Sequence, residues 1–219
     1  MRRSIIDGIL YDPIDKKLEE ILFHLGHTVI DIMRQKRMPV GEPAYCPFAS
    51  YVFAKDCGNS IALIQGADAV GIWHYKNGGF GGFANQTLEY DRYNLQRLAE
   101  LKLVHGNTCF GYFLDELAIR RHNAFNNSFS IFCGRNGIEK KCQQATLLKE
   151  DVDFIMLGSD GVTVQDATAD MTAYAVELFG DYKVFGAEGL IEKSRKIAAL
   201  KNLTAHEPKQ EAALLVIEP

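Results

Sequence analysis

The chain lacks any apolar run that could cross a membrane, and it lacks the excess of positive charge that attracts anionic partners. Its 219 residues include 24 lysines and arginines against 28 acidic side chains, which gives a net charge of −4. A membrane-spanning helix needs about 18 consecutive apolar residues, and nucleic acids or anionic lipids need a basic surface. We therefore expect binding neither to nucleic acid nor to a membrane. Residues 1–8 carry two arginines but no long apolar core, so we expect no secretory signal peptide.

Cysteine is too sparse and too irregularly spaced to build a disulfide framework or a zinc site. The five cysteines include no C-x-x-C pair, and the six histidines include no H-E-x-x-H motif. His24 and His27 share a predicted helix, where such a pair usually belongs to the surface or the core. An odd number of isolated thiols fits reduced cysteines, so we expect a cytoplasmic protein. The cysteines are Cys46, Cys57, Cys109, Cys133 and Cys142.

The chain is long enough for one well-buried domain, which we predict to span residues 1–219, and 47% of its residues are hydrophobic. Apolar residues that recur every three or four positions predict one long amphipathic helix over residues 14–37. Other helices are predicted over residues 91–103, 110–121, 169–179 and 188–200. Strands are predicted over residues 4–6, 48–55, 60–66, 70–75, 128–133, 145–148, 154–157 and 211–217.

The order of these elements predicts the fold class. Short turns separate the strands over residues 48–55, 60–66 and 70–75, which indicates an antiparallel meander. Residues 80–90 are glycine-rich and are predicted to form a loop, whereas residues 211–217 are so apolar that we expect them at the centre of a sheet. Because strands and helices occur in blocks, we predict an α+β fold with two sheets and helices outside them, not a doubly wound parallel sheet.

One stretch carries a candidate for chemistry. Residues 154–157 are an apolar run typical of a buried strand, and Gly158-Ser159-Asp160-Gly161 follows directly. A carboxylate at the end of a buried strand is costly to desolvate unless it meets a cation or hydrogen-bond donors. Asp160 is therefore a candidate ligand for a hard ion such as Mg²⁺ or Mn²⁺. The alternative is that Asp-Gly only forms a turn, which is the commoner use of this pair.

Four blocks occur in an order that resembles the metal-dependent serine/threonine protein phosphatases of type 2C, and in particular their divergent bacterial members. Asp68 and Asp91 fall on aspartates of the family pattern, and Ser159-Asp160-Gly161 matches its most specific motif. The final strand is preceded by Glu211, where the family has an acidic pair. The matching blocks are residues 48–52, 64–72, 88–95 and 154–161.

This resemblance implies a four-layer αββα sandwich of two antiparallel sheets flanked by helices. It also implies hydrolysis of phosphoserine or phosphothreonine in a phosphoprotein substrate by a water that Mn²⁺ or Mg²⁺ activates. Asp160 would be both a metal ligand and a catalytic residue, and Glu211 would take the ligand position before the last strand. Asp91 would serve an outlying third ion. Asp68, the second catalytic candidate, would support its turn by hydrogen bonding.

The sequence also departs from the family pattern. Ala67 and Ala69 flank Asp68 in place of glycine and serine, and Gln210 stands where an acid is expected. The first strands of the pattern are absent apart from a short match that contains Asp7, a further candidate metal ligand. Three explanations stay open: the sequence is truncated at its N-terminus, Asp7 acts alone, or the protein is a catalytically silent homologue that binds a regulatory protein partner.

Three weaker alternatives lie outside this family. An N-terminal-nucleophile hydrolase would require processing to expose Ser4. A cysteine hydrolase would pair Cys46 or Cys57 with His74. The glycine-rich residues 78–82 would suit a phosphate cradle, but no clear helix start follows them, so we interpret them as a loop.

Overall fold

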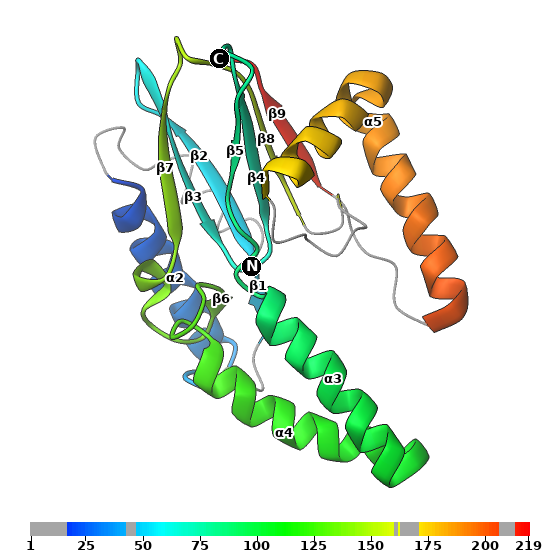
Figure 1. Cartoon of the computed structure of the whole chain (residues 1–219). Helices are drawn as coiled ribbons and strands as arrows, with labels where there is room; N and C mark the ends of the chain where they lie inside the picture. The colour runs from blue at the N-terminus through cyan, green and yellow to red at the C-terminus, as the bar shows by residue number, and fades with distance from the viewer. Residues whose placement is uncertain (1–16, 43–46, 160–161, 163–170, 206–212) are drawn as a thin grey trace. The chain divides into compact units, whose positions relative to one another are not determined.

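The computed structural model describes residues 17–42, 47–159, 162, 171–205 and 213–219 (Figure 1). The chain divides into two compact units. One unit contains Met1–Ser50 and Gln86–Cys142, and the other contains Tyr51–Asn85 and Gln143–Pro219. The single domain that we expected over residues 1–219 stays a prediction. No helix of the described segments is long and apolar enough to span a membrane.

The second unit contains two antiparallel sheets (Figure 1). The three-stranded sheet has the order β2-β3-β7, and the four-stranded sheet has the order β5-β4-β8-β9. Every neighbouring pair within them is antiparallel. The strands are β2 (Tyr51–Asp56), β3 (Ser60–Gly66), β4 (Val70–Tyr75), β5 (Phe80–Gly82), β7 (Gln143–Leu148), β8 (Val152–Gly158) and β9 (Leu214–Ile217).

A shared hydrophobic core holds the two sheets face to face. Leu63 from β3, Trp73 from β4 and Ile155 and Leu157 from β8 are buried in one cluster. Alternate residues of a strand point to opposite faces, so the neighbours Phe154 and Met156 project away from this core. They join a second buried cluster, and this burial on both faces explains why the β8 sequence is continuously apolar.

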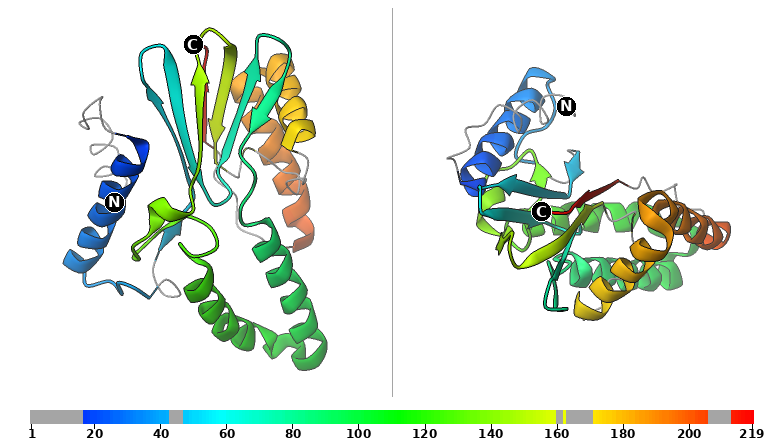
Figure 2. Two further views of the ribbon diagram at one scale, coloured as in Figure 1. Left: turned by 60° about the vertical axis from the view of Figure 1, so that its left-hand side comes forward. Right: turned by 90° about the horizontal axis from the view of Figure 1, so that it is seen from above.

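Helix α5 (Met171–Ala205) covers that second face of the four-stranded sheet (Figure 2). Its Tyr174, Leu178 and Leu190 pack in the cluster that contains Phe154. The helix is interrupted at Gly186, where φ is 68° and ψ is −178°. This break matches the two separate helices that we predicted. Two antiparallel sheets with a helix outside them confirm the predicted α+β class.

The first unit is built from helices and one short sheet. Its strands β1 (Phe48–Ala49) and β6 (Phe132–Cys133) pair with each other. Helix α2 (Leu18–Gln35) buries an apolar stripe that includes Leu22, Val29 and Met33, which confirms the predicted 3.6-residue period. The other helices are α3 (Leu88–His105), η1 (Gly106–Thr108), α4 (Cys109–Ala124) and η2 (Ile138–Lys140).

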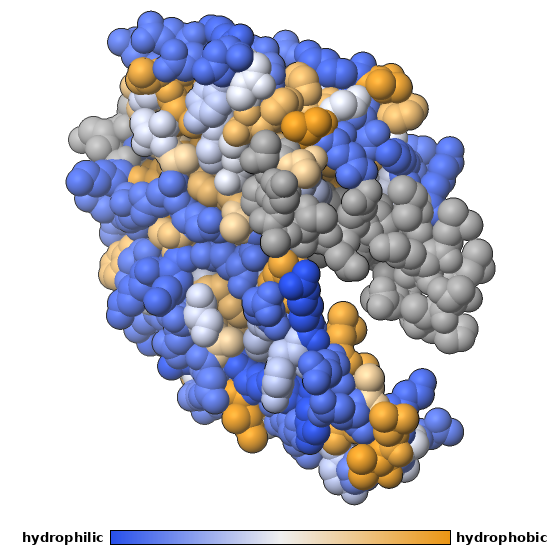
Figure 3. Space-filling view, in the orientation of Figure 1, coloured by the Kyte–Doolittle hydropathy of each residue, from blue (hydrophilic) through white to orange (hydrophobic). Residues whose placement is uncertain are grey.

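Helices α3 and α4 form a hairpin with a small apolar core. Leu101, Cys109 and Phe113 are buried between the helices. Figure 3 shows hydrophobic surface toward its lower right, at the far end of this hairpin. Leu103 near the end of α3 and Phe110 at the start of α4 are exposed. Polar side chains also contribute to the α3–α4 contact, since Arg97 on α3 hydrogen-bonds to Glu116 on α4.

Two strand predictions are wrong because pairing partners cannot be read from local sequence. Residues 48–55 do not form one strand, since β1 pairs with β6 whereas β2 pairs with β3. The predicted meander is also wrong, because β3 and β4 belong to different sheets. Ala67 between them adopts a left-handed φ of 62°, which turns the chain from one sheet into the other.

Two further predictions need correction at the edges of the four-stranded sheet. Residues 80–82 form strand β5, and a Cβ on Gly81 would overlap the indole ring of Trp73. Gly81 therefore allows β5 to pack closely against β4, and it does not form part of a phosphate-binding loop. Among the strands that the structure describes, β9 lies at the edge of the sheet, beside β8, and not at its centre. Residues 4–6, predicted as a strand, lie outside the described residues.

Candidate active site

The candidate site lies at one end of the four-stranded sheet, where β4 begins, β8 ends and β9 begins (Figure 1). Gly158 at the end of β8 is paired on one side with Val70 and on the other with Leu214. Because both pairs are antiparallel, this register brings together three segments that are far apart in the sequence.

Further hydrogen bonds extend this pairing beyond the strands. The backbone N–H of Ser159 donates to the Ala213 carbonyl over 3.0 Å, and the Ala213 N–H donates to Ser159 Oγ over 3.0 Å. The Val162 N–H donates to the Ser159 carbonyl over 3.0 Å. The buried Ser194 hydroxyl on α5 donates to the Val162 carbonyl over 2.6 Å. Both residues that flank Asp160 and Gly161 in the sequence are thus anchored.

Three candidate carboxylates lie next to these segments in the sequence. Asp68 precedes Val70 by two residues, Asp160 follows Ser159, and Glu211 precedes Ala213 by two residues. Asp160, Glu211 and Asp7 are outside the described residues, so their roles stay predictions. Carboxylate oxygens are the ligands that Mg²⁺ and Mn²⁺ prefer, so the chemistry of this donor set fits a hard divalent ion.

Asp68 is the described member of this set. It lies in the turn between β3 and β4 and is partly exposed. The fully buried Gln65 side chain holds the turn on both sides of Asp68, because its Nε2 donates to the Ala67 carbonyl over 2.8 Å and to the Ala69 carbonyl over 2.9 Å. Gln65 was not among the predicted site residues, although it is the one amide in β3 and follows the apolar residues Leu63 and Ile64.

Asp91 lies in the other compact unit, in the first turn of α3. Its Oδ2 accepts a hydrogen bond from the Thr87 hydroxyl over 2.5 Å, and its N–H donates to the Thr87 carbonyl over 2.8 Å. An acid in the first turn of a helix is stabilised by the helix dipole. In the structure Asp91 therefore stabilises the start of α3, and its binding of an outlying ion stays a prediction.

The described residues do not complete a metal centre by themselves. Among them, no group of three or more histidine, cysteine, aspartate or glutamate side chains could hold a metal ion. The cysteine-hydrolase alternative receives no support from Cys57, since His74 Nδ1 lies 2.7 Å from Asp153 Oδ1 and Cys57 Sγ donates to the Lys55 carbonyl. Cys46, its other candidate nucleophile, lies outside the described residues.

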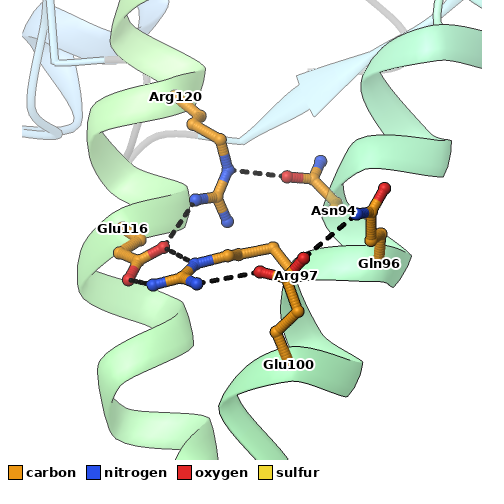
Figure 4. Close-up of polar contacts among 6 residues, drawn as sticks. All are labelled: Asn94, Gln96, Arg97, Glu100, Glu116 and Arg120. Carbon is orange, nitrogen blue, oxygen red and sulfur yellow. Dashed lines mark hydrogen bonds and ion pairs between the residues drawn. The ribbon is translucent and has the colours of Figure 1, made fainter.

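A network of charged side chains joins α3 to α4 (Figure 4). Arg97 makes two hydrogen bonds of 2.8 Å to the Glu116 carboxylate and one of 2.9 Å to Glu100. Arg120 donates to Glu116 over 3.1 Å and to Asn94 over 2.7 Å. The hydrogen bonds from Arg97 and then Arg120 lower the pKa of Glu116 to about 2. With every carboxylate of this cluster matched by a guanidinium, we interpret it as a clamp between two helices and not as a reactive site.

No protein-family model matches the sequence, and no curated protein matches it. Among solved structures, a serine-threonine phosphatase 2C from Toxoplasma gondii has a TM-score of 0.51 at 10% identity, over 97% of this chain and 73% of its own. The catalytic domain of the serine/threonine protein phosphatase PstP, in complex with 2 manganese ions, has a TM-score of 0.48 at 12% identity, over 98% of this chain and 78% of its own.

A sex-determining protein of C. elegans is also similar, with a TM-score of 0.47 and 12% identity. The match includes 98% of this chain, which spans only 50% of that protein's chain. At such low identities these likenesses concern the fold alone. The Toxoplasma comparison shows that the chain has the α+β fold of the type 2C phosphatases.

Proposed function

We propose that this chain is a metal-dependent phosphoprotein phosphatase that hydrolyses phosphoserine or phosphothreonine. The register at the end of the four-stranded sheet is the observation that carries this proposal. It aligns Val70, Gly158 and Leu214, and the sequence places Asp68, Asp160 and Glu211 just beyond those three positions. Carboxylates that lie next to these three positions in the sequence, on the fold of the type 2C phosphatases, support a phosphatase over other hydrolases.

In this proposal Asp160 and Glu211 hold Mn²⁺ or Mg²⁺, Asp7 contributes a further oxygen, and Asp91 serves an outlying ion. Divalent ions bound there would polarise the phosphoryl group and lower the pKa of a bound water. The carboxylates of the chain would neutralise the charge of the ions, and the hydrogen bonds of neighbouring residues would fix the positions of these carboxylates. The hydrogen bonds of Ser159 and Val162 would position Asp160, and those of Gln65 would position Asp68.

Hydrolysis of p-nitrophenyl phosphate with added manganese tests the proposal. We expect manganese-dependent turnover that Asp160→Asn abolishes. Asp153→Asn is the matched control, because it makes the same change on β8 at the His74 pair and should retain turnover. Equal turnover in wild type and Asp160→Asn would refute the assignment. Phosphothreonine and phosphotyrosine peptides then test the substrate class.

The second candidate function is a catalytically silent homologue that binds a regulatory protein partner. Ala67, Ala69 and Gln210, which replace family residues around the site, favour it. A folded wild-type protein with neither turnover nor manganese-dependent stabilisation would support this candidate. For both candidates we propose a cytoplasmic location, because an odd number of irregularly spaced cysteines fits reduced thiols better than a disulfide framework.

A further inference from the structure

Both polar atoms of the buried Gln65 side-chain amide make hydrogen bonds. Its side chain has no exposed area. Both hydrogens of Nε2 are donated, one to the Ala67 carbonyl over 2.8 Å and one to the Ala69 carbonyl over 2.9 Å. Its Oε1 accepts a hydrogen bond of 2.8 Å from Gln143 Nε2. An amide is the only neutral side chain that provides two such donors and an acceptor together.

Gln143 connects this corner to a third segment of the chain. It lies directly opposite Gln65 in the β3–β7 pairing. Its Nε2 also donates to the Ala84 carbonyl over 2.6 Å, and its Oε1 accepts from the Ala84 N–H over 3.2 Å. The start of β7, the end of β3 and the segment after β5 are therefore joined by two side chains.

The turn that Gln65 holds is conformationally demanding. Ala67 has a φ of 62°, which is disfavoured for a residue with a Cβ and persists only where its surroundings fix it. The two carbonyls that Gln65 binds belong to the residues on either side of Asp68. The same turn leads into Val70, which is paired with Gly158 at the end of β8. The geometry of Asp68 relative to β8 thus depends on one buried amide.

We propose that Gln65 is a positioning residue for the phosphatase site: it fixes the Asp68 turn against the end of β8, where Asp160 follows. This inference rests on the proposed function, since it assigns Gln65 a role in the same site. Gln65 would not touch metal or substrate. Its effect would reach the metal ligands through the Asp68 turn and the Val70–Gly158 pair at the end of β8, in the way that residues behind a ligand set its orientation.

The test is Gln65→Met, which keeps the length of the side chain and removes its hydrogen bonds. We expect roughly 10- to 100-fold weaker manganese affinity, the usual loss when a residue behind a metal site is removed. The affinity is measured from the manganese dependence of the unfolding temperature, which needs no turnover. Hydrogen exchange of peptides covering residues 66–70, without metal, should also be faster in the variant.

Ile61→Ala is the matched control, because it destabilises the same strand in the core between the sheets and leaves the corner intact. It should leave manganese affinity unchanged. If it weakens affinity as much as Gln65→Met, the effect is a general loss of stability and the inference fails. If Gln65→Met does not fold, Gln143→Leu removes one of the hydrogen bonds of Gln65 and should shift affinity in the same direction by less.

The two proposals fail in different ways. A wild-type protein that neither hydrolyses phosphate esters nor responds to manganese refutes the proposed function. A wild-type response that Gln65→Met leaves unchanged, with unchanged exchange over residues 66–70, refutes the positioning role alone.

Discussion

Gly158→Ala is the sharpest test of how the end of β8 is built. A Cβ at this position would lie 3.0 Å from Val162 Cγ2 and 3.1 Å from the Ala213 carbonyl oxygen. The valine methyl can move, but the carbonyl oxygen accepts the Ser159 N–H and belongs to the backbone beside β9. Overpacking of this kind costs about 1–3 kcal/mol, and we expect about 2 kcal/mol here because one of the two neighbours is backbone.

The fluorescence of Trp73 provides the assay. It is the only tryptophan of the chain, and it is buried in the core between the two sheets, so its thermal transition reports on the second unit. For a chain of this size, a loss of about 2 kcal/mol lowers the unfolding temperature by roughly 4–8 °C.

Gly180→Ala makes the same chemical change where nothing lies within 4 Å of the added methyl group. This position is exposed and helical in α5, so the change should stabilise the protein by about 0.5–1 kcal/mol. The two variants are therefore expected to shift the transition in opposite directions. If Gly158→Ala unfolds at or above the wild-type temperature, the close approach of Val162 and Ala213 to Gly158 is wrong.

Two further predictions concern the core and the helix clamp. Phe154→Ala should cost about 3–5 kcal/mol in the same fluorescence assay, because the ring is buried against Phe179 and Tyr182 of α5. Glu116→Gln should lower the stability of the α3–α4 hairpin at neutral pH, as measured by denaturant unfolding followed by circular dichroism. Because hydrogen bonds from Arg97 lower the pKa of Glu116 from 4.5 to about 2, the wild-type advantage is complete above pH 4.5 and lost as the pH falls toward 2. An advantage that does not change over this range would contradict the clamp.

The sequence predicts those elements whose burial is set by local pattern. The apolar stripe of α2 follows from residues such as Leu22, Val29 and Met33, which recur at the helical period. The central position of β8 follows from an apolar run without alternation, because both of its faces are buried. These properties belong to one element at a time, so no knowledge of its partners is needed.

Pairing between strands is not a local property, and the predictions that depend on it are the ones that failed. Short turns after β2 and β3 look alike in the sequence, but only the first closes a hairpin. The second contains Ala67 in a left-handed conformation, held from the side by Gln65, and it sends the chain into another sheet. An apolar strand such as β9 can also lie at an edge, so composition alone does not place it at the centre.

The corner beside Asp68 bears on the choice between an enzyme and a silent scaffold. In a sandwich that only has to stay folded, the amide already has a structural role, because it binds the carbonyls of the buried turn that leads from one sheet into the other. The hydrogen bonds of Gln65 are directed at the two residues that flank Asp68, and the pair Val70–Gly158 carries that fixed geometry to the end of β8. In a phosphatase the same hydrogen bonds would also fix the residues on either side of Asp68, as a site with demanding geometry requires. The two roles predict different results, because only the phosphatase role links Gln65 to metal binding, and the manganese response of Gln65→Met is the measurement that separates them.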